Sequence, residues 1–88
     1  MRNVLVTGGS RGLGLAIATR LASCGYRVIA LARSESDELR AAMATHGEAL
    51  VFQACDLADT AAIGARVGEL RRRVGPLYGL VNNAGLGT

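Results

Sequence analysis

The sequence predicts an α/β fold: a doubly wound parallel sheet with helices on both faces. Short runs rich in apolar and β-branched residues alternate with longer segments whose apolar residues recur at helical spacing, in the order β-α-β-α-β-α-β. The connections are short, and glycine ends each helical segment. Because crossovers between parallel strands are right-handed, few topologies remain, and we expect the strand order 3-2-1-4.

The first half of the chain predicts two strands around one helix. Asn3–Thr7 is a short apolar run bounded by glycine, as expected of a buried strand. Gly25 is the expected end of the following helix, and Tyr26–Ala32 predicts the second strand. The apolar face of that helix is predicted from residues at four-residue intervals: Leu13, Ile17 and Leu21.

The second helix is expected to begin at a serine cap and to end at Gly47. Either Ser34 or Ser36 can cap it, and acidic residues occupy its first turn. Ala49–Cys55 then predicts the third strand.

The third helix is expected to be capped by Asp59 or Thr60 and to end at Gly75 and Pro76. Leu77–Val81 after it predicts the fourth strand. The apolar positions of this helix are Ile63, Val67, Leu70 and Val74. Gly64 and Gly68 lie inside it and each should cost about 1 kcal/mol relative to alanine. We therefore expect them to allow close packing on the sheet.

Composition favours one small domain with a core. The chain has 88 residues, of which 50% are hydrophobic. No run is long and apolar enough for a membrane span, and the first motif begins too near Met1 for a signal peptide. The expected location is therefore cytoplasmic. Cys24 and Cys55 lack metal-ligand spacing, so we expect two small buried apolar side chains and no metal site.

The basic residues are ten arginines, and the formal net charge is +3. The only run, Arg71–Arg73, falls at the end of a predicted helix, where it complements the helix dipole. No aromatic residues accompany it, so nucleic-acid binding is not favoured.

Four glycines fall within Val6–Gly14, between the first strand and the first helix. A pyrophosphate can dock on the unpaired N–H groups of a helix N-terminus where no side chain intervenes. Gly8 would permit the tight turn, Gly12 the approach of the ligand, and Gly14 close helix–strand packing. Ser10 and Arg11 can add hydrogen bonds to phosphate. The alternative is a tight turn without a ligand.

The second strand ends in Ala32-Arg33-Ser34, without the acidic residue that usually holds the ribose of NAD. A guanidinium suits the 2′-phosphate of NADP, and Arg11 would approach the same phosphate from the glycine loop. The alternative for Arg33 is a solvated residue in a turn.

Polar residues follow the third and fourth strands, whose carboxyl ends border the expected ligand crevice. Asp56 could accept a hydrogen bond from the adenine amino group, or it could only form the turn before the third helix. Asn82 and Asn83 could tie neighbouring strands together or face the ribose.

Three motifs together resemble the short-chain dehydrogenase/reductase family: Thr7-Gly8-Gly9-Ser10-Arg11-Gly12-Leu13-Gly14, Asp56-Leu57 and Asn82-Asn83-Ala84-Gly85. The combination is similar to NADPH-dependent carbonyl reductases, including the 3-oxoacyl-carrier-protein reductases. The resemblance implies a Rossmann-type fold and hydride transfer between a nicotinamide and a carbonyl or alcohol carbon. It implies cofactor binding by Gly8, Ser10, Arg11, Gly12, Leu13, Gly14, Arg33, Asp56, Leu57, Asn83, Ala84 and Gly85.

The resemblance also implies catalytic residues that residues 1–88 do not contain. The family uses a serine and a Tyr-x-x-x-Lys pair, whereas this sequence has no lysine and its tyrosines, Tyr26 and Tyr78, lie in or beside predicted strands. We therefore expect the cofactor-binding N-terminal half of a larger enzyme, a homo-oligomer when complete. Another polypeptide carrying the rest of the fold should pair with Leu77–Val81. The alternative is a free-standing nucleotide-binding module without catalysis.

Overall fold

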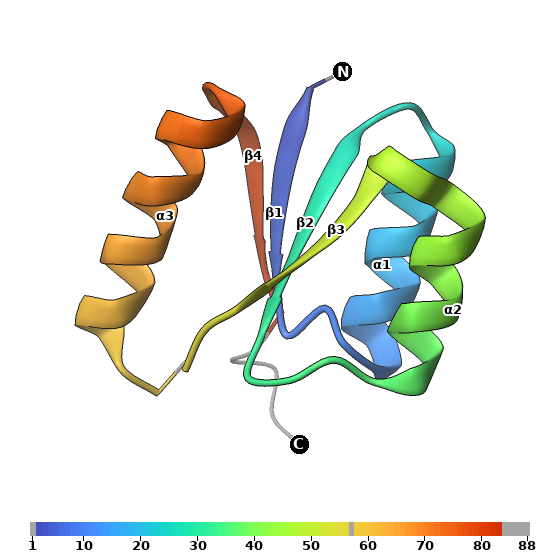
Figure 1. Cartoon of the computed structure of the whole chain (residues 1–88), viewed down its shortest axis with the longest axis horizontal. Helices are drawn as coiled ribbons and strands as arrows, with labels where there is room; N and C mark the ends of the chain where they lie inside the picture. The colour runs from blue at the N-terminus through green and yellow to red at the C-terminus, as the bar shows by residue number, and fades with distance from the viewer. Residues whose placement is uncertain (1, 57, 84–88) are drawn as a thin grey trace.

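A computed structural model of the chain describes residues 2–56 and 58–83 and contains all the expected elements (Figure 1). Four parallel strands form one sheet in the order β3-β2-β1-β4, which confirms the predicted topology. A single 3-10 turn, Gly47–Ala49, precedes β3. The elements are β1 (Asn3–Thr7), α1 (Gly12–Ser23), β2 (Arg27–Ala32), α2 (Asp37–His46), β3 (Leu50–Ala54), α3 (Thr60–Val74) and β4 (Leu77–Asn82).

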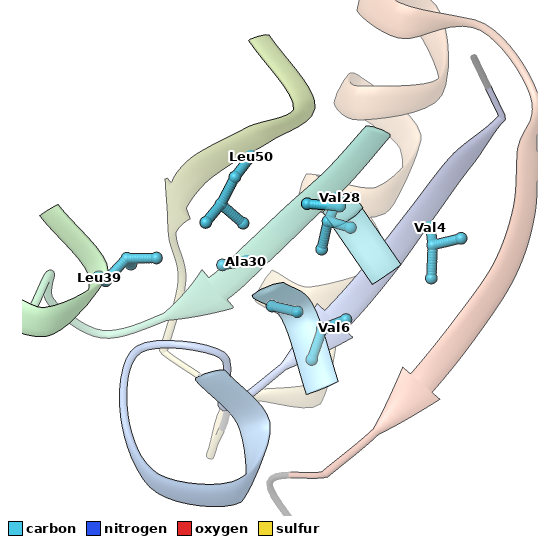
Figure 2. Close-up of a cluster of buried hydrophobic side chains, with 8 residues drawn as sticks. Val4, Val6, Val28, Ala30, Leu39 and Leu50 are labelled. Carbon is cyan, nitrogen blue, oxygen red and sulfur yellow. The ribbon is translucent and has the colours of Figure 1, made fainter. Parts of the chain in front are cut away.

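Helices cover both faces of the sheet, so the fold is doubly wound as expected. Helices α1 and α2 lie on one face and α3 on the other (Figure 1). Buried side chains alternate between the two faces along β1 and β2. The cluster beneath α1 and α2 contains Val4, Val6, Ala18, Ala22, Val28, Ala30, Leu39 and Leu50 (Figure 2). The cluster beneath α3 contains Leu5, Ile29, Leu31, Cys55 and Leu70.

The helix caps resolve two alternatives that the sequence left open. Ser36, not Ser34, caps α2, because its hydroxyl accepts a hydrogen bond of 2.9 Å from the N–H of Leu39. Asp59 caps α3 by accepting hydrogen bonds from the N–H groups of Ala61 and Ala62, at 3.1 and 3.2 Å. Each helix is followed by a glycine with positive φ, at positions 25, 47 and 75, which confirms the predicted stops.

The expected apolar face of α1 is wrong at its first residue. Leu13 is 61% exposed, and the buried stripe of α1 consists of Gly14, Ala18 and Ala22. Ala18 and Ala22 belong to the buried cluster beneath α1 and α2, and their small side chains permit a close approach of the helix to the sheet. Ile17 and Leu21 flank this stripe and are only partly buried.

Two further expectations about packing are wrong. A Cβ atom added to Gly64 would meet nothing within 4 Å, and one added to Gly68 would meet only the Arg72 side chain at 3.7 Å. These glycines therefore do not serve close packing on the sheet, which α3 contacts through its apolar positions as predicted. Cys24 is exposed rather than buried, because it follows α1 at the end of the layer, whereas Cys55 is buried as expected.

Strand β4 lies at one edge of the sheet and begins with an irregularity. Asn3 pairs with Leu77 but Val4 pairs with Gly79, so Tyr78 is an extra residue on the β4 side. The Tyr78 ring stacks on Tyr26 at a centroid distance of 5.8 Å, and the Arg2 guanidinium lies 4.5 Å from its centroid. Tyr78 and Leu80 remain largely exposed on this edge strand.

Within the described ranges, no helix has both the length and the apolar character needed to cross a bilayer.

Candidate cofactor-binding site

The glycine loop between β1 and α1 lies at the carboxyl edge of the sheet (Figure 1). The N–H of Gly8 donates to the carbonyl of Leu31 at 2.7 Å and thereby continues the pairing of β1 with β2. Gly8 has a φ of 67°, which glycine adopts readily. A Cβ atom at Gly9 would lie 2.9 Å from Cβ of Ala30, so no larger residue fits there. This role of Gly9 is not visible in the sequence, since it depends on how closely the loop approaches β2.

Gly12 and Gly14 differ sharply in their surroundings. A Cβ atom at Gly14 would lie 2.0 Å from the carbonyl oxygen of Gly8 and 2.6 Å from Nδ2 of Asn83. This agrees with the expected role of Gly14 in close helix–strand packing. A Cβ atom at Gly12 would meet nothing within 4 Å, and Gly12 has a φ of 59°. Space therefore remains open at the first residue of α1.

The N-terminus of α1 has no side-chain cap, unlike those of α2 and α3. Arg11 occupies the cap position and accepts only through its backbone carbonyl, from the N–H of Leu15 at 3.3 Å. The first turn of α1 contains no acidic residue. Its N–H groups and the positive end of the helix dipole are thus available to an anion.

Two exposed arginines border segments at the carboxyl edge of the sheet. Arg11 directly precedes α1, and Arg33 directly follows β2. Neither guanidinium has an ion pair or a hydrogen bond within residues 2–56 and 58–83. By contrast, Arg40 bonds Glu35 at 3.3 Å and Asp37 at 3.1 Å. The acidic residues nearest to Arg33 in the sequence are therefore engaged elsewhere.

Asn82 and Asn83 tie β4 to β1. The hydroxyl of Thr7 accepts from the N–H of Asn83 at 3.0 Å and donates to Oδ1 of Asn82 at 3.0 Å. Nδ2 of Asn83 donates to the carbonyl of Gly8 at 3.4 Å. The first of the two alternatives, a tie between strands, is confirmed for these asparagines. A contact of Asn83 with the cofactor stays a prediction. Thr7 was not among the predicted site residues, although a buried polar residue ending a strand just before the glycine cluster was a signal for it.

Asp56 forms the turn that leads into α3. Its Oδ1 accepts from the N–H of Ala58 at 3.0 Å, and its carbonyl accepts from the N–H of Asp59 at 3.1 Å. The carboxylate is exposed, and its expected contact with adenine stays a prediction. In the part of the chain that the structure describes, no three His, Cys, Asp or Glu residues gather at a distance suited to a metal ion. The predicted residues Leu57, Ala84 and Gly85 lie outside the described residues.

Ser10 contributes its carbonyl to the loop in a way the sequence does not show. The carbonyl accepts a hydrogen bond from the hydroxyl of Ser36, the residue that caps α2. The hydroxyl of Ser10 is buried and has no hydrogen-bond partner among the described residues. Its expected contact with phosphate stays a prediction. The sequence pointed to Ser36 only as a helix cap.

The comparison with known families decides how this arrangement is classified. The family described as short chain dehydrogenase matches residues 2–88. The chain belongs to the short-chain dehydrogenase family. The resemblance carried by the three motifs is thereby confirmed.

Relatives within this family carry the names of different enzymes. The chain is 39% identical over 85 residues to the 3-oxoacyl-[acyl-carrier-protein] reductase MabA of Mycobacterium tuberculosis, covering 97% of this chain and 31% of that protein. It is 36% identical over 92 residues to (+)-neomenthol dehydrogenase of Arabidopsis thaliana, covering 98% of this chain and 31% of that protein.

A solved structure also matches closely. A metagenomic short-chain oxidoreductase in complex with NADP superimposes with a TM-score of 0.84 at 40% identity, covering 98% of this chain and 40% of the other. This chain therefore spans about a third of the length of the family members it matches.

Proposed function

We propose that this chain binds NADP(H) as the cofactor-binding part of a short-chain oxidoreductase. The observation that carries the proposal is the N-terminus of α1, which has no side-chain cap and lies beside open space at Gly12. A helix end of this kind, directly after a strand and a glycine loop, suits a dinucleotide pyrophosphate. The family member whose structure contains NADP supports the same cofactor.

The pyrophosphate would be held mainly by the backbone. The N–H groups in the first turn of α1 are the donors, and Gly12 leaves them accessible because it has no side chain. Leu13 is exposed in this turn and contributes its backbone N–H there. Asn83 bonds Thr7 and the carbonyl of Gly8, and so ties the start of the glycine loop to β1 and to the end of β4.

The 2′-phosphate would be held by Arg33, with Arg11 approaching from the glycine loop. Both guanidinium groups are exposed and free of acidic partners within the described residues. A carboxylate at the end of β2 would favour the ribose hydroxyl of NAD, and this position is Arg33 instead. The positive charge of Arg33 at this position favours the 2′-phosphate of NADP over the 2′-hydroxyl of NAD.

Bound NADP(H) supplies the hydride chemistry, which in this family connects a carbonyl with an alcohol carbon. Residues 1–88 contribute binding and orientation of the cofactor, since the serine, tyrosine and lysine implied by the resemblance have no counterparts in them. The names of the relatives, a 3-oxoacyl reductase and a neomenthol dehydrogenase, support a small-molecule carbonyl or alcohol substrate. We also infer a homo-oligomer in the cytoplasm as the complete form.

Titration of NADP and NAD into the complete protein tests this proposal. We expect tighter binding of NADP, and we expect Arg33→Asp to weaken NADP binding by roughly 1.5–3 kcal/mol, about 10- to 150-fold, because a charge-assisted hydrogen bond is lost. NAD binding should improve, since a carboxylate accepts bonds from a 2′-hydroxyl.

Arg20→Asp is the matched control, because it makes the same charge change in the last turn of α1, away from the glycine loop. It should leave the preference unchanged. A wild-type protein that binds neither cofactor would refute the proposal, and binding of NADP without turnover of any carbonyl substrate would favour a non-catalytic module.

A further inference from the structure

One hydroxyl group joins the glycine loop to helix α2. The Oγ of Ser36 accepts from the N–H of Leu39 at 2.9 Å and donates to the carbonyl of Ser10. The two serines are 26 residues apart in the sequence, and both are buried. This contact is therefore shielded from water, and a bond to solvent cannot easily replace it.

The segments that this bond joins each carry one of the two exposed arginines. The glycine loop, residues 8–11, ends in Arg11. The connection between β2 and α2, residues 33–36, begins with Arg33. Figure 1 shows both segments at the carboxyl edge of the sheet, beside the N-termini of α1 and α2. A bond between them restricts how far the two backbones can separate.

Capping alone does not require the second bond. A cap needs only an acceptor, and Asp59 caps α3 through acceptance alone. Ser36 also supplies a donor, which satisfies a carbonyl in the turn that precedes α1. Ser34, which is exposed, could serve as a cap by residue type but does not occupy this position.

We propose that Ser36 is a positioning residue that sets the spacing between Arg11 and Arg33 and so favours the 2′-phosphate of NADP over the 2′-hydroxyl of NAD. This inference rests on the proposed function. Without the donor, the carbonyl of Ser10 loses this partner and the glycine loop is no longer held to the connection between β2 and α2, so the loop is free to shift. A shifted loop moves Arg11 relative to Arg33.

The test compares Ser36→Gly with Ser36→Thr in the complete protein. Glycine at a cap position costs only a few tenths of a kcal/mol relative to serine, so α2 should persist while the donor is lost. Threonine keeps both the acceptor and the donor. Dissociation constants for NADP and NAD are measured by titration, and thermal unfolding is measured without cofactor.

We expect Ser36→Gly to raise the dissociation constant for NADP about fivefold or more, which is the size of effect expected for the loss of one hydrogen bond. The constant for NAD should rise by clearly less. Ser36→Thr should restore the preference for NADP, and Ser34→Ala should leave it unchanged. Amide exchange in residues 9–12 should be faster in Ser36→Gly than in the wild type.

The outcomes distinguish failure of the proposed function from failure of the role assigned to Ser36. If wild-type protein does not bind NADP, the proposed function fails. If it binds NADP and Ser36→Gly keeps the same ratio of the two constants, Ser36 is only a cap and this inference fails. If Ser36→Gly does not fold, Ser36→Ala replaces it, because alanine also lacks the donor. An unchanged ratio in that variant would overturn the inference equally.

Discussion

At the scale of single residues, the glycines of the loop are required for different physical reasons. Gly9 and Gly14 leave no room for a Cβ atom, because Ala30 and the carbonyl of Gly8 already occupy that space. Gly12 has open space around it and is constrained only by its positive φ. The first two glycines therefore support packing, whereas Gly12 keeps a surface free. A ligand that approaches the N-terminus of α1 would use that surface.

Gly12→Val should abolish binding of NADP and NAD while the protein still folds. Both Val and Ala are strained at this φ, by roughly 1–2 kcal/mol. Only the branched side chain of Val fills the open space beside the helix N–H groups. Gly12→Ala is therefore the matched control and should retain more affinity, and it should also be the more stable of the two because a β-branched residue tolerates positive φ least. Titration and thermal unfolding of both variants check this, and normal affinity of Gly12→Val would contradict the phosphate-binding role of the loop.

At the scale of elements, the three helices differ at their N-termini. Helices α2 and α3 begin with side-chain caps, Ser36 and Asp59, and α1 begins without one. An uncapped end costs stability unless water or a ligand satisfies its N–H groups. The uncapped helix is the one that follows the glycine loop. The N–H groups left without a side-chain cap thus lie where we place the cofactor.

Helix α3 carries a glycine that the fold does not need. Nothing lies within 4 Å of a Cβ atom at Gly64, so Gly64→Ala should stabilise the protein by up to about 1 kcal/mol through helix propensity. Gly75→Ala, at the end of the same helix, should destabilise it instead, because Gly75 has a φ of 93°. Chemical denaturation of both variants tests this. A loss of stability in Gly64→Ala would show that the backbone at this position needs glycine.

At the scale of the whole molecule, the sheet is protected unevenly. Strands β1 and β2 are buried between helices on both faces. Strand β4 is an edge strand, and within the described residues no strand pairs with its outer side. Leu80 on this strand is 63% exposed. It pairs with Leu5, whose side chain lies beneath α3, so Leu80 is on the same face of the sheet as α3. An exposed apolar edge of this kind favours pairing with another chain.

A polypeptide of these 88 residues by itself should therefore self-associate, and Leu80→Lys should reduce the association. A charge on the edge strand opposes edge-to-edge pairing without removing a buried contact. Sedimentation velocity across a dilution series measures the effect. A monodisperse wild-type monomer that melts cooperatively would contradict this prediction and the expectation that another polypeptide pairs with Leu77–Val81.

Periodicity and turn chemistry in the sequence alone determined the elements, their order and the parallel strand order. These features depend on neighbouring residues and on the right-handed crossover, which apply before any tertiary contact is known. The motifs likewise indicated the glycine loop and Arg33 as the candidate site.

Only the tertiary structure decided which side of each helix meets the sheet and which distant groups bond. The buried stripe of α1 lies at Gly14, Ala18 and Ala22 instead of including Leu13, because the distance between helix and sheet selects small residues, and no local pattern encodes that distance. The bonds from Ser36 to Ser10 and from Asn83 to Thr7 join residues 26 and 76 positions apart. Such pairs arise from the way the strands and loops stack. The sequence therefore offered the asparagines as ties between strands only as one alternative, and it did not show the bond between Ser36 and Ser10.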